Sequence, residues 1–472
     1  MIKQRGWALL GALVGAVALI CGTLFAAFGL LGTSAGAGAS RAGAGVSVGT
    51  GPGTGSGSGS GSGTSTGRPV APVPSDGWTG TWTTAPAGVE PEAPTGYPGS
   101  SIRNVVHTSI GGTEVRVTFS NIYSPTALLI GHASIAVRAG DGAGAAPGSM
   151  RRLMFERRAA VTVPPGGQIV SDPVALAVPY AGELLVTLYT PAAGGPVTYH
   201  PNALQTSYLA DGDHTEDPAG DAYTRPTKAW RYLTAVDVLN HRTAGAVVAF
   251  GDSITDGVGS RTDANHRWPD ILAARLRDQH IGVLNEGIGG NRVLADSVDL
   301  AKGESGIARF RRDALGRAGV RVVIVDLGVN DILRGAETDP ARIVNGLREL
   351  THQAHERGLR VIGATLTPFG GHRGHNATTE SVRARVNAEI RAGRVFDDVV
   401  DFDLVVRDPD APERLRPAYD SGDHLHPSDA GYLAMGDRLD LRILEKALNV
   451  PLTEPSTGPT GRPAEKALAR RL

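Results

Sequence analysis

Cysteine is nearly absent from the 472-residue sequence: Cys21 is the only one, so the chain cannot form an internal disulfide. An excess of charge of one sign is also missing, because 46 Lys and Arg residues balance 47 Asp and Glu residues and leave a formal net charge of −1. Without a positive overall field, we expect no nucleic-acid partner. Glycine, by contrast, is abundant at 64 residues, about twice its usual share. This excess indicates that the composition is uneven along the chain.

The amino-terminal segment has no charged side chain from residue 7 to residue 32, and Lys3 and Arg5 precede it. This arrangement of charge is typical of an export signal. As a helix the segment would reach about 39 Å, which is long enough for an uncleaved membrane anchor. The small residues at 35–39 instead fit a signal-peptidase site, so residues 1–32 are either a cleaved signal peptide or an anchor. Both interpretations place the rest of the chain outside the cytoplasm, secreted or tethered to the outer face of the membrane.

Two segments have too few apolar residues to form a core. Residues 33–75 are almost entirely Gly, Ser, Thr, Ala and Pro, and residues 451–472 are again rich in Pro, Thr and Gly. Such compositions favour disorder. We therefore expect a disordered linker at 33–75, a disordered tail at 451–472 and the folded part between them.

Between residues 76 and 240, apolar and polar residues alternate in short runs. Examples are 114–120 and 183–189, and turns that contain Gly, Pro and Asp separate such runs. Alternation with a period of two is typical of antiparallel strands with one buried face. Because no convincing helical stretch interrupts this region, we expect an all-β, sandwich-like accessory domain at 76–240.

From residue 241 to residue 450 the sequence alternates between strand-like and helix-like patterns. Short apolar runs without polar alternation indicate strands that are buried on both faces, and amphipathic stretches lie between them. This order predicts an α/β domain built on a parallel sheet. The expected strands are 246–250, 281–284, 320–327, 359–366 and 399–402, and the expected helices include 268–277, 340–356 and 380–392.

Polar motifs follow the first three strands, and another lies near the end of the domain. In parallel α/β folds, ligands bind at the carboxyl ends of the strands, so these motifs are expected to meet there. Taken singly, each has a structural explanation: Asp252 or Ser253 would cap a helix, glycines allow tight turns, and Asn330 would also cap a helix. The motifs are Gly-Asp-Ser-Ile at 251–254, a glycine turn at 285–291, Gly-Val-Asn-Asp at 328–331 and Asp-His-Leu-His-Pro at 423–427.

Taken together, the four motifs supply the groups that acyl transfer requires. A serine hydroxyl is a poor nucleophile at neutral pH and needs a base, and the base needs a carboxylate to orient it. The tetrahedral oxyanion needs hydrogen-bond donors that are already in place. The motifs offer a candidate for each of these parts.

The four motifs resemble those of the SGNH, or GDSL, hydrolase family of esterases and lipases, over residues 244–450. The family takes its name from a Ser, a Gly, an Asn and a His, which correspond here to Ser253, Gly290, Asn330 and His426. One departure is Ile at position 254, where the GDSL motif has Leu.

This resemblance implies a flavodoxin-like three-layer α/β/α domain and a catalytic triad of Ser253 as nucleophile, His426 as general base and Asp423 as its orienting acid. It also implies an oxyanion hole formed by the N–H groups of Ser253 and Gly290 and the side-chain amide of Asn330. Neither a cofactor nor a metal is implied.

The choice between the two histidines of the last motif also rests on local physics. Pro427 disfavours the helical conformation at His426, and a three-residue offset from Asp423 lets the carboxylate reach the ring. Adjacent side chains usually point apart, which leaves His424 as the weaker alternative. The other histidines are expected to be surface or structural residues; examples are His107, His200, His214 and His372.

Other families of hydrolases and binding proteins fit less well. The Gly-x-Ser-x-Gly elbow of α/β-hydrolases is missing, because Thr255 occupies the second glycine position. A dinucleotide-binding loop is interrupted by Arg292. A metal hydrolase that uses Asp252, Asp256 and the last motif stays open, although the His-Glu-x-x-His pattern does not occur.

The expected function is therefore hydrolysis of carboxylic esters through an acyl-enzyme, outside the cytoplasm, by a monomer. An aromatic content of only 5% favours short acyl groups, such as acetyl esters on a polysaccharide or a small polar carrier. The opening Trp78-Thr-Gly-Thr-Trp82 and the two-part layout resemble secreted actinobacterial members of the family, some of them associated with polysaccharide deacetylation. The alternatives are a lipase that acts on longer acyl esters and a catalytically silent protein that binds carbohydrate or the cell wall.

Overall fold

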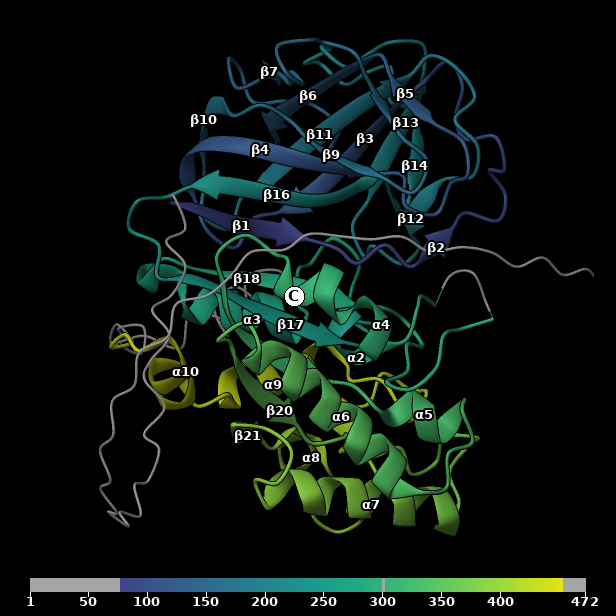
Figure 1. Cartoon of the computed structure of the whole chain (residues 1–472), viewed down its shortest axis with the longest axis vertical. Helices are drawn as coiled ribbons and strands as arrows, with labels where there is room; N and C mark the ends of the chain where they lie inside the picture. Colours follow the sequence, from purple (N-terminus) through teal and green to yellow (C-terminus); the bar gives the residue numbers. More distant parts are fainter. Residues whose placement is uncertain (1–76, 299–301, 453–472) are drawn as a thin grey trace, which may run out of the picture. The chain divides into compact units, whose positions relative to one another are not determined.

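The computed structural model describes residues 77–298 and 302–452. In these ranges the chain forms an antiparallel β region that ends at Leu239 and a parallel α/β region that begins at Gly245 (Figure 1). The predicted signal or anchor at 7–32 and the predicted linker lie outside the described residues, as does nearly all of the predicted tail. None of the helices in the described ranges is long and apolar enough to cross a membrane.

The first region contains only strands, in agreement with the alternating sequence pattern. Its strands are β1 (Trp78–Thr83), β2 (Gly88–Val89), β3 (Ser100–His107), β4 (Gly112–Ser120), β5 (Leu128–Ile130), β6 (His132–Val137), β7 (Arg151–Arg152), β8 (Val161–Val163), β9 (Gln168–Val170), β10 (Val174–Val178), β11 (Glu183–Thr190), β12 (Thr198–His200), β13 (Ser207–Asp211), β14 (Arg225–Thr227), β15 (Trp230–Arg231) and β16 (Leu233–Leu239).

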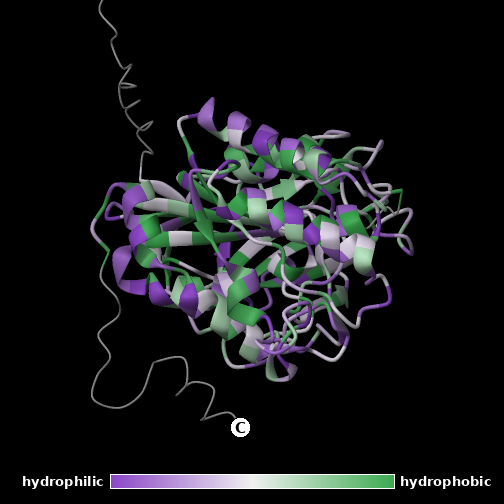
Figure 2. Cartoon of the chain, turned by 90° about the horizontal axis from the view of Figure 1, so that it is seen from below, coloured by the Kyte–Doolittle hydropathy of each residue, from purple (hydrophilic) through white to green (hydrophobic). Residues whose placement is uncertain are grey.

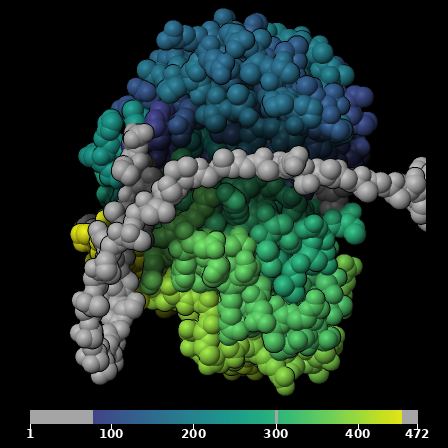
Figure 3. All heavy atoms as spheres, in the orientation of Figure 1, coloured from purple at the N-terminus to yellow at the C-terminus, as the bar shows by residue number. Residues whose placement is uncertain are grey.

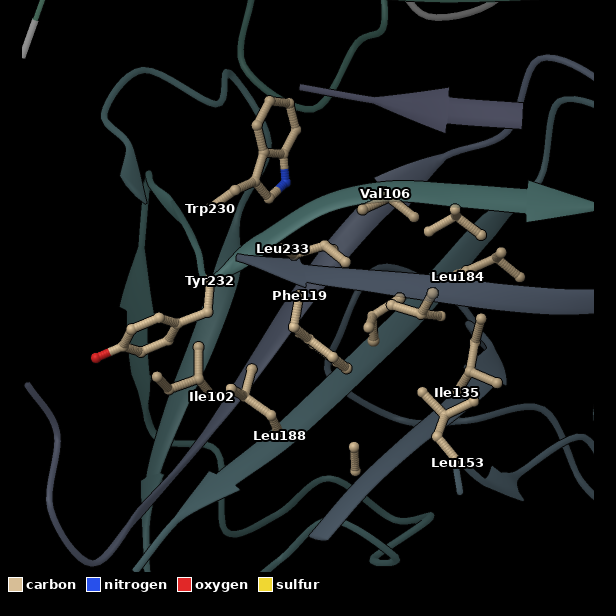
Figure 4. Packing of buried hydrophobic residues seen from close by; sticks show 14 of the residues in the cluster. Ile102, Val106, Phe119, Ile135, Leu153, Leu184, Leu188, Trp230, Tyr232 and Leu233 are labelled. Atoms are coloured by element: carbon tan, nitrogen blue, oxygen red, sulfur yellow. The ribbon is translucent and has the colours of Figure 1, made fainter. Parts of the chain in front are cut away.

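Two antiparallel sheets form most of this region. One has the order β1-β16-β4-β10, with β9 also paired to β4, and the other has the order β14-β13-β3-β11-β6-β7. Along β4, Val115, Val117 and Phe119 are buried while the residues between them are partly exposed. Phe119 packs in one cluster with Ile102 and Leu188 of the second sheet (Figure 4). The two apolar sheet faces therefore share one core, as expected for a sandwich.

The second region alternates strands and helices. Its strands are β17 (Gly245–Gly251), β18 (Ile281–Gly287), β19 (Val320–Asp326), β20 (Arg360–Ala364) and β21 (Asp398–Val400). Its helices are α2 (Ser253–Asp256), α3 (Trp268–Arg275), α4 (Gly306–Phe310), α5 (Val329–Leu333), α6 (Pro340–His355), α7 (Ala377–Arg391), α8 (Phe402–Val406), α9 (Asp429–Arg438) and α10 (Leu441–Leu448). Two short 3₁₀ helices, η1 (Arg277–Gln279) and η3 (Pro417–Tyr419), and one π-helical segment, η2 (Arg311–Leu315), complete it.

The five strands of this region form one parallel sheet in the order β18-β17-β19-β20-β21. Counted along the chain, this is the 2-1-3-4-5 order of flavodoxin-like folds. Both faces are covered, because Val248 packs in one apolar cluster with Leu347 of α6, while Val247 packs in another with Leu272 of α3. The expected three-layer α/β/α domain is confirmed. The helices contain both hydrophilic and hydrophobic residues (Figure 2).

Three neighbouring strands end at the same level of this sheet. Gly251 of β17 is paired with Gly287 of β18 and with Asp326 of β19. The segments that follow these three positions are the sequence motifs that contain Ser253, Gly290 and Asn330. The sheet register therefore brings the motifs together, as predicted.

The β region contacts the parallel sheet directly through β1 and β18. The Gly80 N–H donates to the Ala318 carbonyl at 3.0 Å. A Cβ atom added to Gly282 of β18 would lie 2.3 Å from the Gly80 carbonyl oxygen, so only glycine allows the two strands this close. The space-filling view shows the two regions in different colours, blue for the first and green to yellow for most of the second (Figure 3).

Candidate active site

The nucleophile turn joins β17 to α2. The Asp252 carboxylate accepts a hydrogen bond from the Ile254 N–H at 3.0 Å and so caps this short helix. Ser253 is therefore the first helical residue, directly above the end of a central strand. The turn ends at Gly257, whose φ of 102° lies in the left-handed region.

The structure brings the three predicted triad residues into one hydrogen-bonded chain. His426 Nε2 lies 2.8 Å from Ser253 Oγ, and His426 Nδ1 lies 2.5 Å from Asp423 Oδ2. The other Asp423 oxygen accepts from the backbone N–H groups of His426 at 2.8 Å and Leu425 at 3.0 Å. Partial burial raises the pKa of Asp423, but the hydrogen bonds from His426 outweigh it and leave this pKa below its ordinary value of 3.8. Asp423 is therefore ionised at neutral pH and orients the imidazole.

The second histidine of this motif points to a different partner. His424 Nδ1 lies 2.6 Å from Asp420 Oδ2, and the His424 side chain is exposed. Its backbone has a φ of 63°, which is uncommon for a residue with a side chain. Of the two histidines, only His426 contacts the serine.

The predicted oxyanion donors lie in motifs that the structure brings close together. Within the described residues, the N–H groups of Ser253 and Gly290 have no acceptor. Gly290 has a φ of 80°, so glycine is favoured at this turn. Asn330 donates one amide N–H to Asp252 Oδ2 at 3.3 Å, and the second N–H of the same amide is left for a ligand. The arrangement matches the requirements of an oxyanion hole.

A buried arginine that sequence analysis did not identify supports this turn. Arg309, fully buried on α4, donates to the Gly251 carbonyl at 2.8 Å and to the Glu286 carbonyl at 2.9 Å. It also donates to Asn291 Oδ1 at 3.0 Å, directly beside Gly290. Arg309 therefore ties the ends of two strands to the oxyanion turn.

Asp331 ties the third motif to the second. Its carboxylate accepts from the Val293 N–H at 2.8 Å and from the Leu294 N–H at 3.0 Å. Asp331 belongs to the Gly-Val-Asn-Asp motif that sequence analysis identified, but its contact with the backbone at 293–294 was not predicted. Because Asn330 is the preceding residue, this contact fixes the distance between Asn330 and the glycine turn.

Two carboxyl groups are buried beneath the nucleophile. Burial raises the pKa of Asp326 to about 7, even though Thr255 Oγ1 donates to it at 3.0 Å. Burial and the charge of Asp326 raise the pKa of Asp252 well above its ordinary value. A higher pKa at Asp252 lowers the negative charge beside Asn330, which favours formation of an oxyanion there.

The residues considered for a metal hydrolase are used in other contacts. Asp252 caps α2, His424 bonds to Asp420, and Asp256 bonds to His200. In residues 77–298 and 302–452, no three or more His, Cys, Asp or Glu side chains gather where a metal ion could be held.

Comparison with known families agrees with this geometry. Residues 249–434 match the model of the GDSL-like lipase/acylhydrolase family. The match covers the part of the chain that holds Ser253, Gly290, Asn330 and His426. The acylhydrolase domain is thus an SGNH-type serine ester hydrolase, as the sequence motifs predicted.

Solved structures similar to this part of the chain include two esterases and a lipase. A search of curated proteins found no match. A carbohydrate acetylesterase from Sinorhizobium meliloti is 18% identical with a TM-score of 0.36, and the alignment covers 43% of this chain and 99% of that one. The native aryl esterase of M. smegmatis is 20% identical with a TM-score of 0.36 and coverages of 43% and 99%. A GDSL-like lipase from Bacteroides thetaiotaomicron is 19% identical with a TM-score of 0.33 and coverages of 43% and 89%.

Proposed function

We propose that the protein is an extracytoplasmic serine esterase that hydrolyses short-chain esters, acetyl esters above all, on a polysaccharide or a small polar carrier. The observation that carries the proposal is the hydrogen-bonded chain from Ser253 Oγ through His426 to Asp423, with distances of 2.8 Å and 2.5 Å. A carbohydrate-binding protein without catalytic activity would not require Ser253, His426 and Asp423 to be hydrogen-bonded in this order.

Acylation follows from the geometry of the site. His426 Nε2 takes the proton of Ser253 Oγ while this oxygen attacks the ester carbonyl carbon. The carbonyl oxygen becomes an oxyanion and accepts hydrogen bonds from the N–H groups of Ser253 and Gly290 and from the Asn330 amide. The imidazolium, held by the ionised Asp423, then protonates the alcohol oxygen, which leaves and produces an acyl-serine.

Deacylation uses the same groups in the reverse sense. His426 removes a proton from water, the resulting hydroxide oxygen attacks the acyl carbon, and the oxyanion forms in the same place. The acyl–Oγ bond then breaks, Ser253 Oγ recovers its proton from His426, and the carboxylic acid departs. Every proton is handled by one imidazole, so no cofactor is required.

The surroundings of the site favour a polar substrate. A Cβ atom added to Gly290 would lie 2.9 Å from Lys302 Cδ and 3.4 Å from Arg334 Nε, so two cationic side chains pass over the oxyanion turn. Large hydrophobic side chains are exposed at only four positions of the described chain, and these come from separate segments. An enzyme that works on a lipid surface usually presents a continuous apolar patch. The four positions are Leu129, Val170, Val298 and Leu404.

The proposed location rests on the sequence of the amino terminus. The uncharged run at 7–32 with Lys3 and Arg5 before it supports export across the cytoplasmic membrane. Whether the segment is cleaved decides between a secreted enzyme and one tethered to the membrane. Mass spectrometry of the mature protein from its native cells measures this directly, since cleavage near residues 35–39 removes the whole run.

The activity is tested with p-nitrophenyl acetate and p-nitrophenyl palmitate on the full chain. The proposal predicts turnover of the acetate and little turnover of the palmitate. Ser253→Ala should abolish this turnover, whereas Ser381→Ala, which removes an exposed hydroxyl on α7, should not change it. Preference for the palmitate would instead support a lipase, and absence of any serine-dependent turnover would support a binding protein.

A further inference from the structure

An arginine lies beside the oxyanion hole without a carboxylate partner. Arg334 follows α5 directly, and its Nε donates to Asn330 Oδ1 at 3.1 Å. Within the described residues, its guanidinium makes no ion pair, and the side chain is exposed. Buried arginines nearby behave differently, since Arg309 and Arg317 both pair with Asp313.

The hydrogen bond to Asn330 determines which part of Arg334 is available. Because Nε is engaged, the edge formed by the two Nη groups remains for a ligand. This edge presents two parallel N–H donors, the geometry that binds a carboxylate through both of its oxygens. The contact also places the available edge close to the amide that would hold the oxyanion.

Other basic residues lie near the same site. Burial lowers the pKa of His372, and the charge of Arg373 lowers it further. The charge of Asp423 raises this pKa, whereas His426 and Arg334 lower it, so the four groups lie near one another. Arg292, two residues after Gly290, donates to a carbonyl group, that of Asp296.

The carboxylates of the motif loops bond to groups other than Arg334. Asp423 binds His426, Asp420 binds His424, and Asp331 accepts two backbone N–H groups. None of these carboxylates pairs with Arg334, so its guanidinium is a local positive charge at the rim of the site, although the chain as a whole is nearly neutral. A local field of this kind attracts and orients anionic substrates.

We propose that Arg334 binds a carboxylate of the substrate next to the oxyanion hole, so that the enzyme prefers esters with a negative charge close to the scissile bond. Among polymers, this selects acetylated polysaccharides that contain acidic sugars. The inference rests on the proposed esterase function of Ser253 and specifies its substrate class.

Two pairs of esters test this inference on the acyl side and on the alcohol side. For the acyl side, p-nitrophenyl hydrogen succinate carries a carboxylate, and p-nitrophenyl butyrate is its neutral match in chain length. For the alcohol side, p-acetoxybenzoate is compared with phenyl acetate. In each pair the ratio of the two kcat/KM values is measured for the wild type and each variant, so that differences in intrinsic reactivity cancel.

Arg334→Gln should lower the ratio of anionic to neutral ester by about tenfold in at least one pair, the scale of one charge-assisted hydrogen bond. Arg334→Lys keeps the charge but not the two-donor edge, so it should retain part of the preference. Arg385→Gln removes the same charge at an exposed position of α7 and should leave both ratios unchanged. Higher ionic strength should reduce the wild-type ratio, because the site is open to solvent.

An equal loss for the anionic and the neutral ester in both pairs would overturn the inference, because it would mean that Arg334 acts only by positioning Asn330. A loss of the ratio in Arg385→Gln would overturn it as well, since overall charge would then explain the preference. These outcomes differ from failure of the proposed function, in which the wild type would hydrolyse neither neutral ester in a Ser253-dependent way. Thermal unfolding of each variant shows that the measured ratios belong to folded protein.

Discussion

His200 Nε2 lies 3.0 Å from Asp256 Oδ1, and both side chains are buried. His200 belongs to β12 of the antiparallel region, whereas Asp256 is the last residue of α2, the helix that Ser253 begins. The other ring nitrogen, Nδ1, lies 2.9 Å from the Ala85 carbonyl. The β region is thus attached to the nucleophile turn through one imidazole. Burial lowers the pKa of His200, but the charge of Asp256 and its hydrogen bond outweigh burial and raise it above 6.5.

Replacing His200 by Ala should therefore weaken both stability and catalysis. The variant leaves the Asp256 carboxylate buried without its partner, which costs about 3–5 kcal/mol of unfolding free energy. Because α2 also positions Ser253, kcat should fall while KM changes little. Urea unfolding and steady-state kinetics measure the two effects. His214→Ala is the matched control, since His214 pairs with Asp217 at 3.7 Å with partial exposure. Equal unfolding free energies for the two variants would contradict this role of His200.

The assignment of the general base is tested by comparing two histidines of one loop. His426→Ala should reduce kcat by a factor of order 10³ or more, similar to Ser253→Ala, because triad residues act as a unit. His424→Ala removes only the contact with Asp420 and should keep most of the activity. If the His424 variant lost as much activity as the His426 variant, the triad assignment would be wrong.

The oxyanion hole predicts a specific effect of Asn330. Asn330→Ala removes one donor to the transition state, so kcat should fall about 10²- to 10³-fold with a smaller change in KM. Asn345→Ala, at an exposed position of α6, provides the control for loss of an amide. A rise in KM with an unchanged kcat would instead indicate that Asn330 binds the ground state of the substrate.

The buried Asp326 predicts a dependence of stability on pH. Its pKa rises from 3.8 to about 7 on folding, so the folded protein binds more protons than the unfolded chain between these values. Its contribution to stability is therefore present at low pH and is lost as pH rises from about 4 to about 7.

Asp326→Asn should remove this contribution, which is of the order of a few kcal/mol for a shift of this size. The wild type should then lose more unfolding free energy than the variant between pH 5 and pH 8 at about the same ionic strength. Urea unfolding at the two pH values measures the difference. Asp410→Asn, an exposed carboxylate, should follow the wild type. A parallel pH dependence in wild type and Asp326→Asn would show that Asp326 does not titrate in this range.

The sequence was sufficient for the residues that lie in short motifs at strand ends. Ser253, Asn330 and His426 were identified because their motifs together resemble those of the SGNH family, and the strand register explains why the motifs of Ser253 and Asn330 meet. Arg309 and His200 could not be predicted, because their partners Gly251 and Asp256 lie 58 and 56 positions away with no shared periodicity. Such contacts depend on how complete elements pack.

The start of one helix was not predicted. The expected helix at 380–392 begins three residues earlier, at Ala377. Its first turn, Ala-Thr-Thr, has no apolar periodicity, so the hydrophobic pattern alone missed it. Asn376 is the signal that was available, because its side chain accepts from the N–H groups of Thr378 at 2.9 Å and Thr379 at 3.1 Å as an N-cap.

The most direct test of the account is to identify the residue that becomes covalently modified. The full chain is treated with a fluorophosphonate, a reagent that phosphonylates activated serines, and the labelled peptide is located by mass spectrometry. The account predicts a single label on Ser253, loss of labelling in Ser253→Ala and much slower labelling in His426→Ala, with His424→Ala labelled like the wild type. Labelling of a different residue, or full ester hydrolysis by Ser253→Ala, would contradict the proposed nucleophile.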